Sequence, residues 1–153
     1  SHFHKQDFPK LLSYSRFLQL MPRLFVPLCV LLQSLFGEQT GTYIADATSL
    51  PVCHNKRINR NRVFKGLAAR GKTTMGWFFG LKLHMVINHK GSIVAVKITP
   101  GNVDERTVLD EMTRHLKGSL FADKGYISQN LFKTLYQRGL KLITGIKRNM
   151  KFL

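Results

Sequence analysis

Two aspartates stand out by their type and by their position after short apolar runs. Asp46 follows the apolar residues 42–45, and Asp123 follows the apolar residues 120–122. The chain has 8 Asp plus Glu against 24 Lys plus Arg, so an acid in these positions requires a specific reason. Carboxylates that hold two hard cations can promote attack on a phosphodiester and stabilise its leaving oxygen. We therefore interpret both residues as candidate ligands of a divalent metal that acts on a phosphate backbone.

Simpler roles are open to the acids of this chain. Asp46 can be a turn residue that caps the next segment, and Asp123 can cap the turn that follows it. Asp104 precedes a helical pattern, so we expect it to cap that helix rather than to bind a metal. Asp110 and Glu111 fall within the same pattern, and we expect them on its solvated face.

The chain is strongly basic, with a formal net charge of +16 and a pI near 10.4. Lys and Arg at this density favour polyanionic partners, because each neutralised phosphate releases a condensed counterion. Nucleic acid is the first candidate partner, an anionic membrane surface is the second, and a merely soluble basic protein is the third possibility. The basic residues that we expect to contact the DNA backbone are Lys56, Arg57, Arg60, Arg62, Lys65, Arg70, Lys72 and Lys124, of which Lys124 is equally well explained as a plain surface lysine.

The composition is that of a globular domain, with 44% hydrophobic and 10% aromatic residues in 153. Cys29 and Cys53 are expected to be reduced thiols of a cytoplasmic protein. The strongest apolar stretch, residues 24–36, would form a helix of roughly 20 Å at ~1.5 Å per residue, short of the ~30 Å bilayer core. We therefore expect a buried helix there rather than a membrane segment.

Hydrophobic spacing predicts the order of the elements. Residues 13–36 have helical spacing, with Pro22 and Pro27 expected to break or kink the helix and Gly37 expected to end it. The basic residues 50–76 are weakly periodic, so we expect a loop or a mobile subdomain. We also expect strands at 42–46, 79–88, 93–99, 119–123 and 140–146, with a hairpin turn at 88–91 in which Gly91 suits a positive φ. A helix over 104–118 is expected to end at Gly118. A helix over 128–139 is expected to be capped by Ser128 and to end at Gly139, with Leu131, Phe132, Leu135 and Tyr136 facing inward.

The connection between the two aspartate-bearing strands constrains where they lie. A strand, a helical crossover and a second strand in one sheet pack with right-handed, parallel geometry. If the strand before Asp123 lies beside the strand before Asp46, both carboxylates reach the same C-terminal edge of the sheet. Open α/β sheets place their functional sites at that edge.

This element order, with an Asp after the first and fourth core strands, resembles the ribonuclease-H-like fold. The local sequences narrow the resemblance to bacterial insertion-sequence transposases of the DDE class. The sequences that carry it are IADATSL at 44–50, VCHNKR at 52–57, FKGLAARGK at 64–72, TPGNVD at 99–104 and FADKGY at 121–126. The resemblance runs from about residue 8 to the end. It implies an N-terminal helical segment over 1–38 and a catalytic domain over 39–153, with a mixed sheet, flanking helices and a basic insertion at about 50–76.

The resemblance also implies a mechanism. In this family three acids hold two Mg²⁺ or Mn²⁺ ions, and Asp46 and Asp123 match the first and the second acid. Asp46 would bridge both ions and Asp123 would hold one. The third acid is a Glu after the last strand, and no Asp or Glu follows Asp123 here. We therefore expect that Glu beyond Leu153 and weak activity from these 153 residues alone, unless the element is decayed and inactive.

The family further implies that the partners are double-stranded transposon ends and target DNA, that the protein is a homo-oligomer on DNA, and that it lies in the bacterial cytoplasm near the nucleoid, away from membranes. Two other functions remain open. One is a ribonuclease-H-like nuclease without strand transfer, and the other is a non-catalytic nucleic-acid-binding protein. Trp77, Phe78 and Phe79 can stack on a flipped base or pack in the core.

Overall fold

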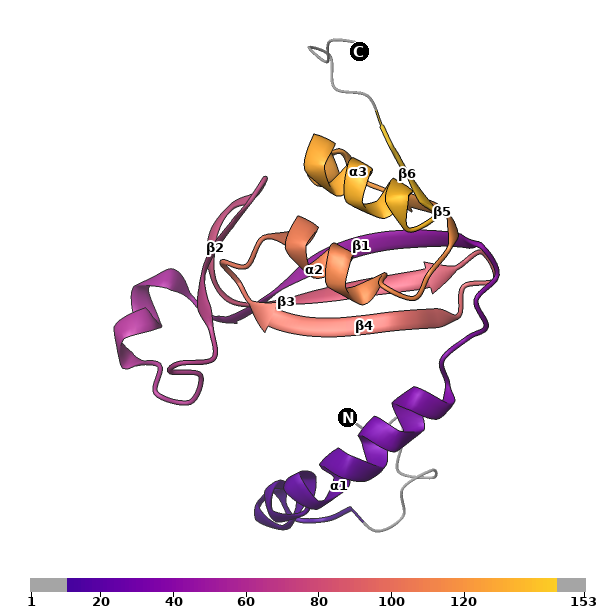
Figure 1. The fold of residues 1–153 in the computed structure, drawn as a ribbon. Coiled ribbons are helices and arrows are strands. Elements are labelled where there is room, and N and C mark those ends of the chain that lie inside the picture. Colours follow the sequence, from indigo (N-terminus) through magenta and orange to yellow (C-terminus); the bar gives the residue numbers. More distant parts are fainter. Residues whose placement is uncertain (1–10, 146–153) are drawn as a thin grey trace. The chain divides into compact units, whose positions relative to one another are not determined.

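The structure is a computed structural model that describes residues 11–145. The chain divides into two compact units, of which the first ends at Leu35 and the second begins at Phe36. The first unit contains the helix α1 (Tyr14–Ser34), and the second contains the sheet and all other elements. Figure 1 shows the elements of both units in the colours of the sequence.

The helix α1 is continuous where a break or a kink was expected. It begins after Ser13, whose hydroxyl oxygen accepts the N–H of Arg16, and it passes through both Pro22 and Pro27. It ends at the C-cap Leu35. The helix therefore does not break at either proline, the alternative of a kink stays a prediction, and the predicted stop at Gly37 was wrong. Within its own unit α1 has no buried residue, so the buried helix that was expected is not found there.

The length of α1 also exceeds the estimate from its most apolar part. Its 21 residues span roughly 32 Å at ~1.5 Å per residue. By length and composition alone, it is long and apolar enough to cross a membrane. Core helices of soluble proteins and signal sequences share this length and composition. These two properties therefore do not place the protein in a membrane.

The second unit is built on one six-stranded mixed sheet, in which β2, β3, β1, β5 and β6 lie in this order and β4 pairs with β3. β1 is antiparallel to β3, and β3 is antiparallel to β2 and β4, whereas β1, β5 and β6 are parallel. The strands are β1 (Thr42–Cys53), β2 (Ala69–Thr73), β3 (Gly76–Asn88), β4 (Ile93–Pro100), β5 (Gly118–Ala122) and β6 (Leu140–Thr144).

Helices connect the parallel strands, and local signals predict where they begin. α2 (Glu105–Met112) begins after Asp104, and α3 (Gln129–Gln137) begins after Ser128, with both side chains capping as expected. α2 ends at Met112, six residues before the predicted glycine stop, because Gly118 instead opens β5. Gly118 has a φ of +113°, and a side chain at this position would meet the backbone of Gly41. The last residue of the expected final strand, 146, lies outside the described residues.

The basic stretch at 50–76 is more ordered than expected. β1 continues to Cys53, a 3-10 helix η1 (Asn55–Arg60) follows, and β2 returns along β3. The cause is the length of β3, which starts at Gly76 and offers backbone partners to both neighbours. The prediction of a loop was therefore wrong for residues 50–53, 55–60 and 69–73, whereas residues 61–68 form turns outside any helix or strand, and mobility stays a prediction.

The hydrophobic core lies between one face of the sheet and the two crossover helices. Tyr43, Val86 and Leu120 from the sheet pack with Leu109 of α2 and Leu135 of α3. Figure 1 shows α2 and α3 on this side of the sheet.

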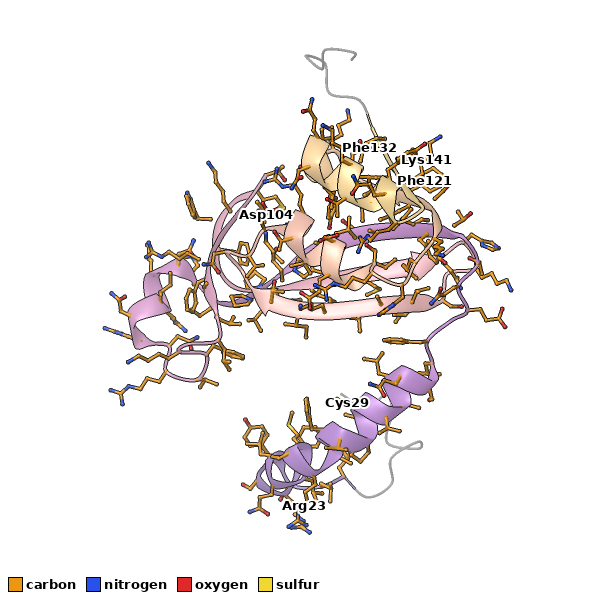
Figure 2. All side chains as sticks on the ribbon, viewed as in Figure 1. Arg23, Cys29, Asp104, Phe121, Phe132 and Lys141 are labelled. Carbon is orange, nitrogen blue, oxygen red and sulfur yellow. The ribbon has the colours of Figure 1, made fainter. Side chains whose placement is uncertain are left out.

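Two aromatic residues of α3 do not face this core as predicted. Phe132 is 43% exposed and Tyr136 is 65% exposed. Their rings stack on each other on the outer side of the helix, with centroids 6.0 Å apart. Phe132 can be located in Figure 2.

We predict a large difference between two truncations on α3. Leu135→Ala removes a fully buried side chain and should lower the free energy of unfolding by about 2–5 kcal/mol. Phe132→Ala removes an exposed ring and should cost less than about 1.5 kcal/mol, mainly its stacking with Tyr136. Urea denaturation followed by circular dichroism measures both, and equal losses would contradict the outward position of Phe132.

Candidate active site

The register of two parallel strands brings Asp46 and Asp123 together. Ala45 on β1 and Ala122 on β5 are the last paired residues of these strands. The two aspartates are the next residue on each strand. Neighbouring strands lie about 4.8 Å apart. The two aspartates are therefore neighbours across these strands at the C-terminal end of β5, although they come from distant parts of the sequence.

Asp46 lies in the middle of its strand and not at its end. β1 continues beyond it because β3 supplies partners, with Asp46 opposite Met85 and Leu50 opposite Leu81. The side chain is exposed, and its Oδ1 accepts the N–H of Ala47 at 2.8 Å. Its Oδ2 has no hydrogen-bond donor among residues 11–145. Since the chain does not turn here, the alternative role as a turn cap does not apply.

Asp123 does cap the turn that follows it. It precedes the 3-10 helix η2 (Lys124–Tyr126), and its Oδ1 accepts the N–H of Gly125. Its backbone oxygen accepts the N–H of Tyr126 at 3.2 Å. The cap uses one carboxylate oxygen, and in the described part of the chain no donor reaches the other. Capping and metal binding are thus compatible at this residue.

The ion pairs set these two acids apart from the others. Residues 11–145 contain seven acids, and five of them form a salt bridge with a Lys or Arg. Asp46 and Asp123 are the two for which the described residues provide no such partner. Residues 11–145 are rich in Lys and Arg, and none of these side chains forms a salt bridge with either aspartate. The two aspartates leave local negative charge that a cation can neutralise.

A buried tyrosine lies close to both aspartates. Tyr126, at the end of η2, is 2% exposed. Burial raises the pKa of its phenol far above the ordinary value, and the nearby carboxylates of Glu105, Asp46 and Asp123 raise it further. The phenol therefore remains protonated at all physiological pH values. It therefore adds no negative charge near the two aspartates.

The remaining acids near the site have structural partners. Asp104 accepts the backbone N–H of Arg106 at 2.9 Å and pairs with its guanidinium at 2.6 Å, which confirms its predicted role as a helix cap. The Arg106 contacts lower the pKa of Asp104 below its usual range. Glu105 pairs with the buried Lys82 at 2.8 Å, and Lys82 also donates to the backbone oxygen of Val103. Figure 2 shows the position of Asp104 at the start of α2.

The basic residues predicted to contact DNA are exposed and fall into three places. Lys56, Arg57 and Arg60 lie on η1, with Arg62 and Lys65 in the turns after it. Arg70 and Lys72 lie on β2, and Lys124 lies on η2 directly beside Asp123. The side chain of Asn55 anchors η1 to β3 by donating to the backbone oxygen of Trp77 at 2.8 Å. Of the three predicted aromatics, Trp77 is exposed and Phe78 is buried.

No three His, Cys, Asp or Glu side chains within residues 11–145 are grouped closely enough to hold a metal ion together. Within these residues, the candidate metal site therefore consists of two carboxylates without a third ligand side chain. Sequence inspection identified both of them, but it did not identify Tyr126 or the Lys82–Glu105 pair beside them. The signal for this pair was weak, because a lysine in an apolar strand is most often exposed.

Comparisons with known proteins give a consistent result. A model of the family described as transposase DDE domain matches residues 36–153. No curated protein matches the chain. Among solved structures, the fold is similar to a chain in the cryo-EM structure of the piggyBac transposase synaptic complex with hairpin DNA. The TM-score is 0.51 at 14% identity, over 74% of this chain and 24% of that chain. The likeness concerns the fold alone, is compatible with the expected ribonuclease-H-like architecture, and spans about a quarter of that transposase.

Burial of His84 beside the site predicts a pH dependence of stability. Burial lowers the pKa of His84, Glu105 partly opposes this, and Lys82 and Lys97 reinforce it. The unfolded chain therefore binds a proton at a higher pH than the folded chain. The stability linked to this group is fully present above about pH 6.5 and is lost as the pH falls below that value, by up to about 1.4 kcal/mol per pH unit.

Unfolding free energies measured between pH 7.5 and 5.5 test this expectation. His84→Gln, which can still bond the Thr99 hydroxyl that His84 contacts at 2.8 Å, should flatten the slope. The exposed His115→Gln is the matched control and should leave the slope unchanged. An equal slope in all three proteins would show that His84 is not the responsible group.

Proposed function

The chain belongs to the transposase DDE domain family, and from this premise we propose that it carries two catalytic acids of a transposase that cleaves DNA and transfers strands in a metal-dependent reaction. The observation that supports this most directly is the position of Asp46 and Asp123 on neighbouring parallel strands. They are also the two acids without a basic partner within residues 11–145. A purely structural pair of adjacent like charges would destabilise the fold without benefit.

The donor set fits a hard divalent cation, Mg²⁺ or Mn²⁺. Each carboxylate uses one oxygen for a backbone N–H and keeps a second that receives no donor from the described residues. Hard cations bind such oxygens and fill their other positions with water. In this proposal Asp46 and Asp123 would hold the ions. When bound, the ions supply activation of the attacking hydroxyl and stabilisation of the leaving oxygen at the phosphodiester.

The residues of this chain have distinct tasks in the proposed reaction. The backbone N–H groups of Ala47 and Gly125 fix the orientation of the two carboxylates. The buried Tyr126 keeps water away from one side of the pair without adding charge. The family pattern requires a third acid, and no Asp or Glu follows Asp123 in the sequence. We therefore propose that these 153 residues alone hold the metals weakly and cleave DNA poorly.

The basic residues of η1 and β2 supply the proposed contacts to DNA. They carry positive charge at one end of β3, while the acids occupy the end of β5, so the phosphate backbone can lie along the sheet between them. Such contacts position the duplex and do not read its sequence. We propose transposon ends and target DNA as the partners, with a homo-oligomer assembling on them, in a bacterial insertion sequence and a cytoplasmic location.

Conservative loss of either candidate ligand should abolish chemistry and preserve binding. In the full-length protein, Asp46→Asn and Asp123→Asn should each lower the cleavage rate more than about a hundredfold, because several kcal/mol of metal-dependent stabilisation are lost. Asp110→Asn is the matched control, since an amide oxygen can still accept from Arg138, and it should cleave normally.

Cleavage of labelled transposon-end DNA with Mg²⁺, gel-shift binding without metal, and strand transfer into a plasmid give the three readouts. Unchanged cleavage by Asp46→Asn would refute the proposal in favour of a nucleic-acid-binding protein. Cleavage without strand transfer by the unaltered protein would indicate a nuclease.

Removal of charge from η1 should weaken DNA binding in a salt-dependent way. Replacing Lys56, Arg57 and Arg60 together by Gln should reduce the slope of log K against log salt by up to about 2.7, at ~0.9 for each phosphate contact. A control that also removes three positive charges, Arg114, Lys133 and Lys141 to Gln, should change the slope much less. Equal effects of the two triple variants would show that η1 is not a specific contact surface.

A further inference from the structure

A cavity of about 490 Å³ opens beside the turn that follows Asp123. One wall is the β2–β3 hairpin with Arg70, Lys72 and Trp77, and the opposite wall is the loop from Gly101 to Asp104 with the first residues of α2. Gly125 of η2 lines the cavity at its side nearest the aspartates. The volume lies in the range of roughly 300–1,000 Å³ that small ligands occupy.

Two glycines set the distance between the walls. A Cβ on Gly71 would meet the backbone oxygen of Gly101, and a Cβ on Gly101 would lie 2.8 Å from the backbone oxygen of Ala69. Gly101 also donates its N–H to the backbone oxygen of Gly80 at 2.9 Å. At the base of the cavity the two walls therefore meet at these glycines, and the ring of Phe78 lies against both of them. This contact makes the cavity a built feature of the sheet edge and not a gap between loose loops.

The charges of the cavity favour an anion. Its two acids are neutralised within the wall, since Asp104 pairs with Arg106 and Glu105 pairs with Lys82. Arg70 and Lys72 form no salt bridge with any acid of residues 11–145. The unbalanced charge of the cavity is thus positive and comes from the β2 wall.

The single tryptophan of the chain lies on the same wall. Trp77 is 63% exposed, whereas its neighbour Phe78 is buried on the opposite side of β3. The Lys72 ammonium lies 5.7 Å from the centroid of the Trp77 ring. Asn55 fixes the backbone of Trp77, so the ring projects from an anchored position. An exposed aromatic ring on an anchored backbone, in a cavity that two cations also line, is the combination with which proteins bind unpaired nucleotides, by stacking a base and neutralising its phosphates.

We propose that this cavity binds an unpaired nucleotide of the DNA strand that passes the Asp46–Asp123 pair, with its base on Trp77 and its phosphates at Arg70 and Lys72. The inference rests on the proposed function for its choice of DNA as partner. It adds that the strand is separated from its complement next to the site of cleavage. A duplex presents no free base face, so the cavity selects single-stranded over double-stranded DNA.

The lone tryptophan allows a direct test with the full chain in EDTA, where no metal-dependent reaction occurs. Titration with a single-stranded thymidine oligonucleotide should quench the Trp77 fluorescence, and a blunt duplex of equal length should quench it less. In anisotropy titrations with a labelled oligonucleotide, Trp77→Ala should weaken single-strand binding roughly 5- to 150-fold, which corresponds to about 1–3 kcal/mol per stacked base. Trp77→Phe should stay within a few-fold of the unaltered protein, and Tyr136→Ala, which removes a similarly exposed aromatic of α3, should have no effect.

The outcomes separate this proposal from the proposed function. Unchanged single-strand binding by Trp77→Ala, or equal weakening of single-strand and duplex binding, would overturn the cavity proposal even if Asp46→Asn abolishes cleavage. A selective loss with Trp77→Ala supports the cavity even if Asp46→Asn leaves cleavage intact, in which case the catalytic proposal fails. Normal circular dichroism and retained binding by Trp77→Phe exclude misfolding as the cause of a loss.

Discussion

The pairing of β1 with β5 is the constraint on which the candidate site depends. Four rungs, ending at Ala45 and Ala122, fix which residues stand beside each other. A slip of one residue would turn every side chain of β5 to the opposite face. The core prevents this slip, because Tyr43 and Leu120 lie on the same rung and are both fully buried beneath the crossover helices. The position of the two aspartates is therefore a consequence of hydrophobic packing on the other face of the same strands.

β3 is the second organising element, since it pairs with three other strands. Its buried face carries Lys82, His84 and Asn88, whereas Leu81, Leu83, Met85 and Ile87 on its other face are only partly buried. Each buried polar group has a partner: a glutamate for Lys82, the Thr99 hydroxyl for His84, and backbone groups of the hairpin for Asn88. These partners satisfy the hydrogen-bonding groups of the three buried side chains. Glu105 is thereby held in a structural pair, as Asp104 is by Arg106, whereas Asp46 and Asp123 have no such basic partner within residues 11–145.

Much of the element order could be predicted from local sequence. The caps Asp104 and Ser128 and the turn glycines Gly91 and Gly139 act within a few residues of themselves, and the structure contains them as predicted. Features that depend on distant partners could not be predicted. The extension of β1 past Asp46 and the existence of β2 require the long edge of β3, and the close approach of β2 requires Gly71 to meet Gly101. Phe132 and Tyr136 have the spacing of core residues, but α3 is too short and peripheral to bury both sides.

The separation of the two aspartates in the sequence has a consequence for the order of events during folding. They are 77 positions apart (123 minus 46), and the β3–β4 hairpin, α2 and β5 lie between them in the sequence. The two residues come together only when β5 pairs with β1. Contacts of such long range form late, because the entropy of closing the loop must be overcome first. The basic segment around η1 is local and needs no such closure. On the proposed function, a nascent or partly folded chain can bind a polyanion before its two aspartates have come together. The ability to cut DNA would then arise only when folding is complete.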